Sequence, residues 1–161
     1  MDSKSFLASV SAFSALDSES LDLISSYAVT EKYRKDEVIL PEGVIGRNIW
    51  VICDGAVSVL QRKEDGNKKE IASLQAGDFF GELSMLSNKP TTAEIQATEP
   101  TITLRIPNKR IAPILEKNLV LESVFSRIFI QRNLENSRKK MDKVLKSTLI
   151  TEHSLTTTYH K

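Results

Sequence analysis

Residues 77–93 read GDFFGELSMLSNKPTTA, and this stretch decides how the fold is predicted. The aromatic pair at 79–80 predicts the end of a strand, and Gly81 then leads into a short helix. Glycine has no side chain, so another group can approach its backbone closely. The first N–H groups of a helix have no partner within the helix and favour an anion. With Glu82 as a strong acceptor in the first turn, the stretch predicts a polar binding loop that receives an anion.

This stretch resembles the phosphate-binding cassette of the cyclic nucleotide-binding domain family. The family includes the regulatory subunits of protein kinase A and the bacterial catabolite activator protein. Its cassette reads roughly F-G-E-[LX]-[AS]-L, then a short loop, then P-R-[AST]-A. The chain matches the first half at residues 80–84 and the second half at Pro90, Thr92 and Ala93. Thr91 stands where the family has an arginine.

The resemblance implies how these residues would meet a ligand. In the family, the glutamate equivalent to Glu82 bonds the ribose 2′-hydroxyl and the arginine pairs with the cyclic phosphate. A threonine hydroxyl does not reproduce that planar, charge-assisted pair. Its loss corresponds to about 1.5–3 kcal/mol, or roughly a tenfold to hundredfold loss in affinity. Lys89 is a possible substitute, but a solvated lysine is the favoured interpretation. The implied ligand-binding residues are Gly81, Glu82, Leu83, Ser84, Thr91, Thr92 and Ala93.

The candidate ligands implied by the resemblance are cAMP and cGMP, with no cofactor. Thr92 occupies the position where family members that prefer cGMP tend to carry threonine. The similarity runs from Phe13 to about Leu134, which is most of the chain.

The segment after residue 28 predicts a mainly β fold. Short runs rich in Val, Ile and Thr are separated by Gly, Pro, Asp or Asn turns, near 29–34, 37–41, 48–54, 56–63, 69–76, 92–98 and 101–106. This spacing predicts an antiparallel β-roll or jelly-roll of about eight strands. We expect Gly66 to supply the positive φ angle of a tight hairpin. We expect Trp50 in the core, and Leu83 and Leu86 to anchor the cassette helix.

Helices are predicted on both sides of the strands. Apolar residues recur near helical spacing over 5–28, and a break at 17–20 divides them into two helices, the second capped by Asp17. Asn108 is expected to cap a further helix that Pro113 bends or divides. A longer helix is predicted from about 119 toward 146.

The C-terminal part is expected to differ from the rest. We predict a cyclic nucleotide-binding-like domain over 1–130, and a helical extension with a flexible polar tail over 131–161. In relatives of the family the equivalent helix caps the nucleotide or forms a dimer seam. The spacing of Leu134, Met141 and Leu145 is compatible with self-association or a protein partner.

Composition limits the remaining possibilities. The chain has 161 residues, of which 40% are hydrophobic and 27% charged, and this suits one globular domain. With 22 basic and 21 acidic residues, no global field favours nucleic acid or membrane. Cys53, the single cysteine, lies in an apolar strand, where an inert buried thiol is expected. No apolar run is long enough to span a bilayer. We therefore expect a cytoplasmic protein without membrane insertion.

Catalysis and DNA reading are both disfavoured. The only histidines, His153 and His160, lie in the polar C-terminal part, which argues against a metal site or a catalytic base. The segment from Arg127 to Lys146 contains seven basic and two acidic residues. A solvated helix face is the favoured interpretation of this positive charge. Transcription factors of the family append a helix-turn-helix domain that is not recognisable here, so sequence-specific DNA binding is not expected.

Two hypotheses follow from the sequence. In the first, the chain is a non-enzymatic regulatory domain that binds a cyclic nucleotide weakly or with altered preference, and passes a shift of its C-terminal helix to a partner. In the second, the site is degenerate and binds no cyclic nucleotide, and the domain is a protein-interaction or dimerisation module. The change at Thr91 favours the second hypothesis, whereas Gly81 and Glu82 favour the first.

Overall fold

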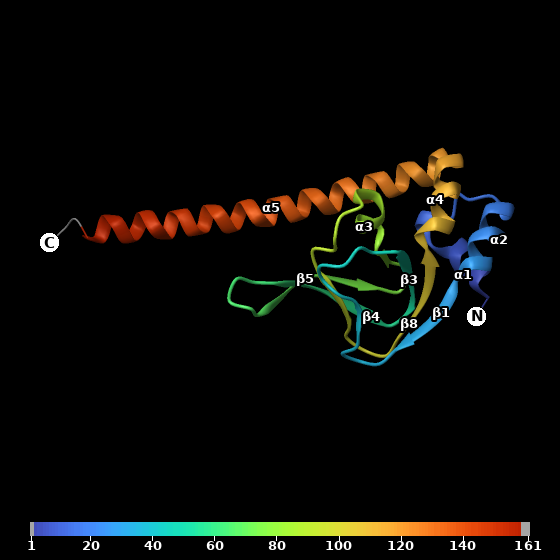
Figure 1. The fold of residues 1–161 in the computed structure, drawn as a ribbon, viewed down its shortest axis with the longest axis horizontal. Helices are drawn as coiled ribbons and strands as arrows, with labels where there is room; N and C mark the ends of the chain where they lie inside the picture. Colours follow the sequence, from blue (N-terminus) through green and yellow to red (C-terminus); the bar gives the residue numbers. More distant parts are fainter. Residues whose placement is uncertain (1, 159–161) are drawn as a thin grey trace. The chain divides into compact units, whose positions relative to one another are not determined.

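The fold consists of two four-stranded antiparallel sheets with helices at both ends of the chain (Figure 1). This computed structural model describes residues 2–158, apart from the side chains of Met85 and of many residues from 133 onward. The strands are β1 Val29–Tyr33, β2 Val38–Leu40, β3 Asn48–Asp54, β4 Ala56–Arg62, β5 Lys68–Gln75, β6 Phe79–Phe80, β7 Glu94–Ala97 and β8 Thr101–Pro107. The helices are α1 Ser3–Ser9, η1 Ser11–Phe13, α2 Ser18–Tyr27, α3 Glu82–Ser87, α4 Asn108–Lys117 and α5 Leu119–Thr158. The predicted eight-stranded antiparallel fold is confirmed.

The strand order explains why the sheets form a roll. One sheet has the order β1-β8-β3-β6 and the other β2-β7-β4-β5, so consecutive strands repeatedly cross between the two sheets. The β4–β5 hairpin turns at Gly66, which has the predicted positive φ of 86°. β1 and β5 are edge strands, and both carry charged residues, which discourage pairing with a further strand.

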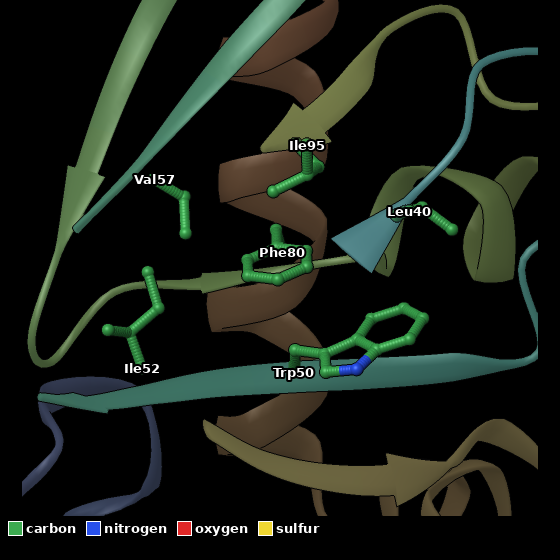
Figure 2. Packing of buried hydrophobic residues seen from close by; sticks show 6 residues of the cluster. All are labelled: Leu40, Trp50, Ile52, Val57, Phe80 and Ile95. Carbon is green, nitrogen blue, oxygen red and sulfur yellow. The ribbon is translucent and has the colours of Figure 1, made fainter. Parts of the chain in front are cut away.

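The interior of the roll contains an apolar cluster. Its buried cluster draws on both sheets, and Trp50 lies within it as predicted, with only 6% of its surface exposed. Figure 2 shows Trp50 beside Phe80, and the two rings stack with centroids 5.4 Å apart. The cluster consists of Leu40, Trp50, Ile52, Val57, Phe80 and Ile95. Because Phe80 directly precedes Gly81, this core supports the start of the cassette helix.

A second apolar layer lies on the outer face of the first sheet. Val51 pairs with Phe79, so their side chains share that face. The Phe79 ring contacts Phe13 from η1 and Phe125 from α5, with centroids 6.3 and 5.0 Å away, and α1, α2 and α4 gather beside β1 and β8 (Figure 1). The helices at both chain ends are therefore packed against the strand that enters the cassette.

The predictions for the helix boundaries are confirmed only in part. Asp17 caps α2 as expected, since its carboxylate accepts the Ser20 N–H at 2.6 Å. Asn108 does not cap α4, because Pro107 precedes the helix and Asn108 is its first residue. Pro113 lies within α4 without dividing it.

The chain forms two compact units, Met1–Phe125 and Ser126–Lys161. The second unit consists of the continuation of α5, which reaches Thr158 and thus extends beyond the predicted end near Lys146. Its apolar side chains Ile130, Leu134, Met141 and Leu145 are each more than half exposed. The side chain of His153 and the whole of His160 lie outside the described residues.

Candidate functional site

Gly81 makes the turn from β6 into α3. Its φ angle is 97°, in the region that favours glycine. A Cβ added there would lie 2.5 Å from the Asn48 carbonyl oxygen and 3.2 Å from the Trp50 ring. Gly81 is therefore required by the close approach of the chain's own strand β3; that its missing side chain also makes room for a ligand stays a prediction.

Glu82 is the first residue of α3, and none of its surface is exposed. A ligand can therefore reach its carboxylate only if neighbouring groups move. α3 has six residues, so few peptide dipoles add up at its start and the field there is weak. In this structure the side chain of Glu82, rather than the helix end, is the principal polar feature of the cassette.

The Ser84 hydroxyl is engaged within the protein. It accepts the Gly46 N–H at 2.8 Å and donates to the Lys89 carbonyl at 2.8 Å. Ser84 is 4% exposed. These bonds hold the two ends of the cassette and the β2–β3 loop together. The Ser84 hydroxyl, which the resemblance assigns to ligand binding, thus also has a structural role.

The Thr91 hydroxyl is also engaged within the protein. It donates to the Pro41 carbonyl at 2.6 Å and accepts the Val44 N–H at 3.2 Å. The Thr91 backbone pairs with the same loop, because its N–H donates to Val44 and its carbonyl accepts from Gly43, both at 2.8 Å. Thr91, which the sequence resemblance matches to the family's arginine, thus fastens residues 41–44 to the cassette.

The remaining cassette residues differ in exposure. Leu83 and Ala93 are half-buried and Thr92 is exposed, and the Thr92 carbonyl accepts from the Gln61 side chain at 3.4 Å. Leu86 is 39% exposed, so the prediction that it anchors α3 is wrong. The Ser84 side chain faces the β2–β3 loop in its place, a contact that the apolar spacing on α3 did not reveal.

A polar cluster next to the cassette was not predicted from the sequence. Arg105 donates through Nε to Glu31 at 2.5 Å and through Nη1 to the Asn48 side chain at 3.3 Å, and the Tyr33 hydroxyl donates to Glu31. Arg105 lies opposite Trp50 in the β3–β8 register, so both side chains occupy the inner face. The only available signal was the strand alternation that puts Glu31, Tyr33 and Arg105 on one face.

The titration of this cluster reflects its environment. Burial raises the pKa of Glu31, but the hydrogen bonds from Tyr33 and Arg105 and the charge of Arg105 outweigh it, so the pKa lies below its ordinary value. Burial, the hydrogen bond to Glu31 and its negative charge raise the pKa of Tyr33 to about 12. At neutral pH the cluster is therefore a carboxylate bound by a phenol and a guanidinium.

Other kinds of site find no support among the described residues. No three His, Cys, Asp or Glu side chains in that part of the chain converge to hold a metal ion. Cys53 is half-buried, and burial raises the pKa of its thiol, which disfavours the reactive thiolate. Within the described range, helices are too short or too polar to cross a bilayer.

Comparisons with known proteins agree with this fold. A cAMP-dependent protein kinase regulatory subunit from Blastocladiella emersonii is 31% identical over 94 residues, which are 58% of this chain and 23% of that protein. The regulatory subunit of a cAMP-independent protein kinase A from Trypanosoma brucei superimposes with a TM-score of 0.75 and 26% identity, covering 85% of this chain and 49% of that one. A variant of the Trypanosoma brucei protein with three substitutions, one of them threonine to arginine, has cAMP bound in its A site.

The corresponding protein from Trypanosoma cruzi, bound to guanosine, gives a TM-score of 0.72 and 26% identity, covering 83% of this chain and 49% of that one. The chain thus spans about half of these structures and a quarter or less of the curated relative. The family model described as "Cyclic nucleotide-binding domain" matches residues 30–118, which include β1 to β8 almost completely and the whole cassette. The chain therefore belongs to the cyclic nucleotide-binding domain family.

Proposed function

We propose that this chain is a non-enzymatic regulatory domain that binds a nucleoside without phosphate in preference to cAMP or cGMP. The observation that carries the proposal is the engagement of the Thr91 hydroxyl with Pro41 and Val44. A hydroxyl can donate one hydrogen bond, and here the Pro41 carbonyl accepts it. The position of the family's arginine thus offers a phosphate neither a positive charge nor a free donor.

The charge balance at the cassette points in the same direction. A cyclic phosphate carries a negative charge, and burying a charge without a partner is costly. The carboxylate side chain of Glu82, which is retained at the start of α3, suits the hydroxyl donors of a ribose and repels a phosphate. Once the groups that cover the buried Glu82 move, a neutral nucleoside makes the favourable contact and avoids the unfavourable one.

Two relatives support this ligand class. The Trypanosoma cruzi regulatory subunit is bound to guanosine, which has no phosphate. The variant of the Trypanosoma brucei protein that is bound to cAMP has gained an arginine in place of a threonine. Both proteins are about a quarter identical to this chain, and the threonine-to-arginine exchange of the variant suggests a test at Thr91.

The test is isothermal titration of the full chain with guanosine, adenosine, cGMP and cAMP, each to millimolar concentration. We expect saturable heat with a nucleoside and at least a tenfold weaker response to the cyclic nucleotides, in line with the roughly tenfold to hundredfold effect of the missing ion pair. Glu82→Gln should weaken the binding of the nucleoside, and Thr91→Arg should shift the ratio of the two affinities toward the cyclic nucleotide. Tighter binding of cAMP or cGMP by the unmodified chain would overturn the proposal.

A second candidate function is a module that binds no nucleotide and acts through protein contacts. It is favoured by the internal bonds of Ser84 and Thr91 and the complete burial of Glu82. The exposed apolar side chains Leu134 and Met141 of α5 are a candidate surface for a second copy. Flat titrations with all four compounds, together with a sedimentation coefficient that falls to that of a monomer in a chain ending near residue 131, would establish this alternative.

A further inference from the structure

The continuation of α5 from Ser126, coloured orange to red in Figure 1, exposes apolar side chains along one stripe. The four residues of the stripe, each more than half exposed, are Ile130, Leu134, Met141 and Leu145. At 3.6 residues per turn they lie within about 60° of one another around the helix axis and extend along it for roughly 22 Å. We call these four residues the α5 stripe. Exposed apolar side chains that gather in this way indicate an interaction surface.

The α5 stripe is bordered by positive charge. The exposed side chains of Arg127 and Arg138 lie about 20° apart around the helix, at one border of the stripe, and the exposed Lys146 directly follows its last residue. Glu135 is also exposed, but it lies about 100° away from the neighbouring Leu134. From Arg127 to Lys146 the sequence has seven basic and two acidic residues, an excess of five positive charges in a chain whose net charge is +1. This part of α5 is therefore both apolar and locally basic.

A partner has to suit both properties. A nucleic acid would pair with the charges but leave the apolar side chains in water. A second copy would cover the stripe but bring two basic segments together, and the heptad frame that puts Leu134 and Met141 in a seam also puts Arg127 and Ser137 there. A protein groove with fixed pockets needs regularly spaced anchors, and Ser137 interrupts the spacing. An anionic bilayer surface has neither of these restrictions.

We propose that this face of α5 binds the surface of a bilayer that contains anionic phospholipids. The α5 stripe enters the boundary between headgroups and acyl chains, which accepts apolar side chains at any spacing. Arg127 and Arg138 extend from the border of the stripe to the negatively charged headgroups. The helix lies in the plane of the surface and does not cross the bilayer. This binding is independent of the cassette and of any nucleoside.

The test is cosedimentation of the full chain with lipid vesicles, without any nucleoside. One set of vesicles is phosphatidylcholine alone, and the other contains about one-third phosphatidylserine. We expect binding to the anionic vesicles at about 0.1 M salt, and binding at least tenfold weaker at about 0.5 M salt, because salt screens the charges. Binding to neither kind of vesicle, or equal binding to both, would overturn the proposal.

Variants locate the contact on α5. Arg138→Gln should weaken binding to the anionic vesicles about fivefold, the contribution of one basic side chain near such a surface. Its matched control is Lys69→Gln, which removes the same charge from the exposed β4–β5 hairpin and should leave binding unchanged. Leu134→Gln should weaken binding at least tenfold, whereas Leu23→Gln, at an exposed leucine of α2, should have no effect. Equal losses in a variant and its control would contradict a contact through α5.

Sedimentation velocity of the same protein separates the bilayer from a second copy. We expect that Leu134→Gln changes vesicle binding and leaves the sedimentation coefficient of the free chain unchanged. A dimer that dissociates in Leu134→Gln, together with no binding to anionic vesicles, would assign the α5 stripe to a second copy and overturn the proposal. These measurements use no nucleoside, so the failure of the proposed nucleoside binding would leave them intact.

Discussion

The Gly81 turn gives the sharpest quantitative prediction, which is the cost of adding one methyl group. Gly81→Ala introduces two separate penalties. A residue with a side chain at a φ of 97° loses about 1–2 kcal/mol. The new Cβ would also lie 2.5 Å from the Asn48 carbonyl oxygen, which belongs to the backbone of β3 and cannot swing aside. Overpacking of this kind costs roughly 1–3 kcal/mol, so we expect a total of about 2–5 kcal/mol.

Gly77→Ala is the matched control for this measurement. Gly77 has nearly the same φ, 93°, but a Cβ added there meets nothing within 4 Å. It should therefore lose only the backbone part, about 1–2 kcal/mol. The assay is guanidinium denaturation followed by fluorescence of Trp50, the single tryptophan, and by circular dichroism. Equal losses in the two variants would refute the conclusion that Gly81 is required by its contact with β3.

Three further predictions concern titratable groups. The pKa of Glu31 is lowered in the folded chain, so its contribution to stability is present above its unfolded pKa and is lost as the pH falls through the folded value. Glu31→Gln should therefore flatten the acid limb of the plot of unfolding free energy against pH, measured by urea denaturation. An unchanged limb would contradict the ion pair with Arg105. The pKa of Tyr33 is raised to about 12, so its contribution to stability is fully present below about pH 10 and is lost as the pH rises toward about 12. Tyr33→Phe should remove that alkaline loss of stability. A Tyr33 signal that titrates near pH 10 in ultraviolet absorbance would contradict the raised pKa. Burial raises the pKa of the Cys53 thiol, so a disulfide reagent at pH 7.5 should label the folded chain more slowly than the unfolded chain, and equal rates would show an open thiol.

Much of the fold was accessible from the sequence because it depends on local patterns. Runs rich in Val, Ile and Thr predicted the strands, and turn residues such as Gly66 predicted where the strands end. Trp50 was placed in the core correctly, because a large aromatic side chain inside an apolar run has few other positions. The limits of the C-terminal helices were harder to predict. Pro113 fits inside α4, and α5 continues where the apolar pattern is weak.

The candidate site was accessible only in part, because its geometry depends on contacts between distant segments. The motif located the cassette, but nothing local to Thr91 shows that its hydroxyl bonds to Pro41 and Val44 about fifty positions earlier. Likewise, the pairing of Arg105 with Glu31 joins two strands that the sequence does not bring together. Single-residue patterns identify which elements form, while the partners of polar side chains follow from how those elements assemble.

The hydrogen bonds of Thr91 have a consequence for how this domain can change during evolution. An arginine at this position would remove both side-chain bonds to the 41–44 loop, at about 0.5–1.5 kcal/mol for each. Natural domains keep a margin of only about 5–15 kcal/mol, so selection for stability opposes this exchange even where the added charge would help a phosphate to bind. The threonine is thus entrenched: because the loop depends on its hydroxyl, an arginine becomes accessible only after the loop has acquired another support.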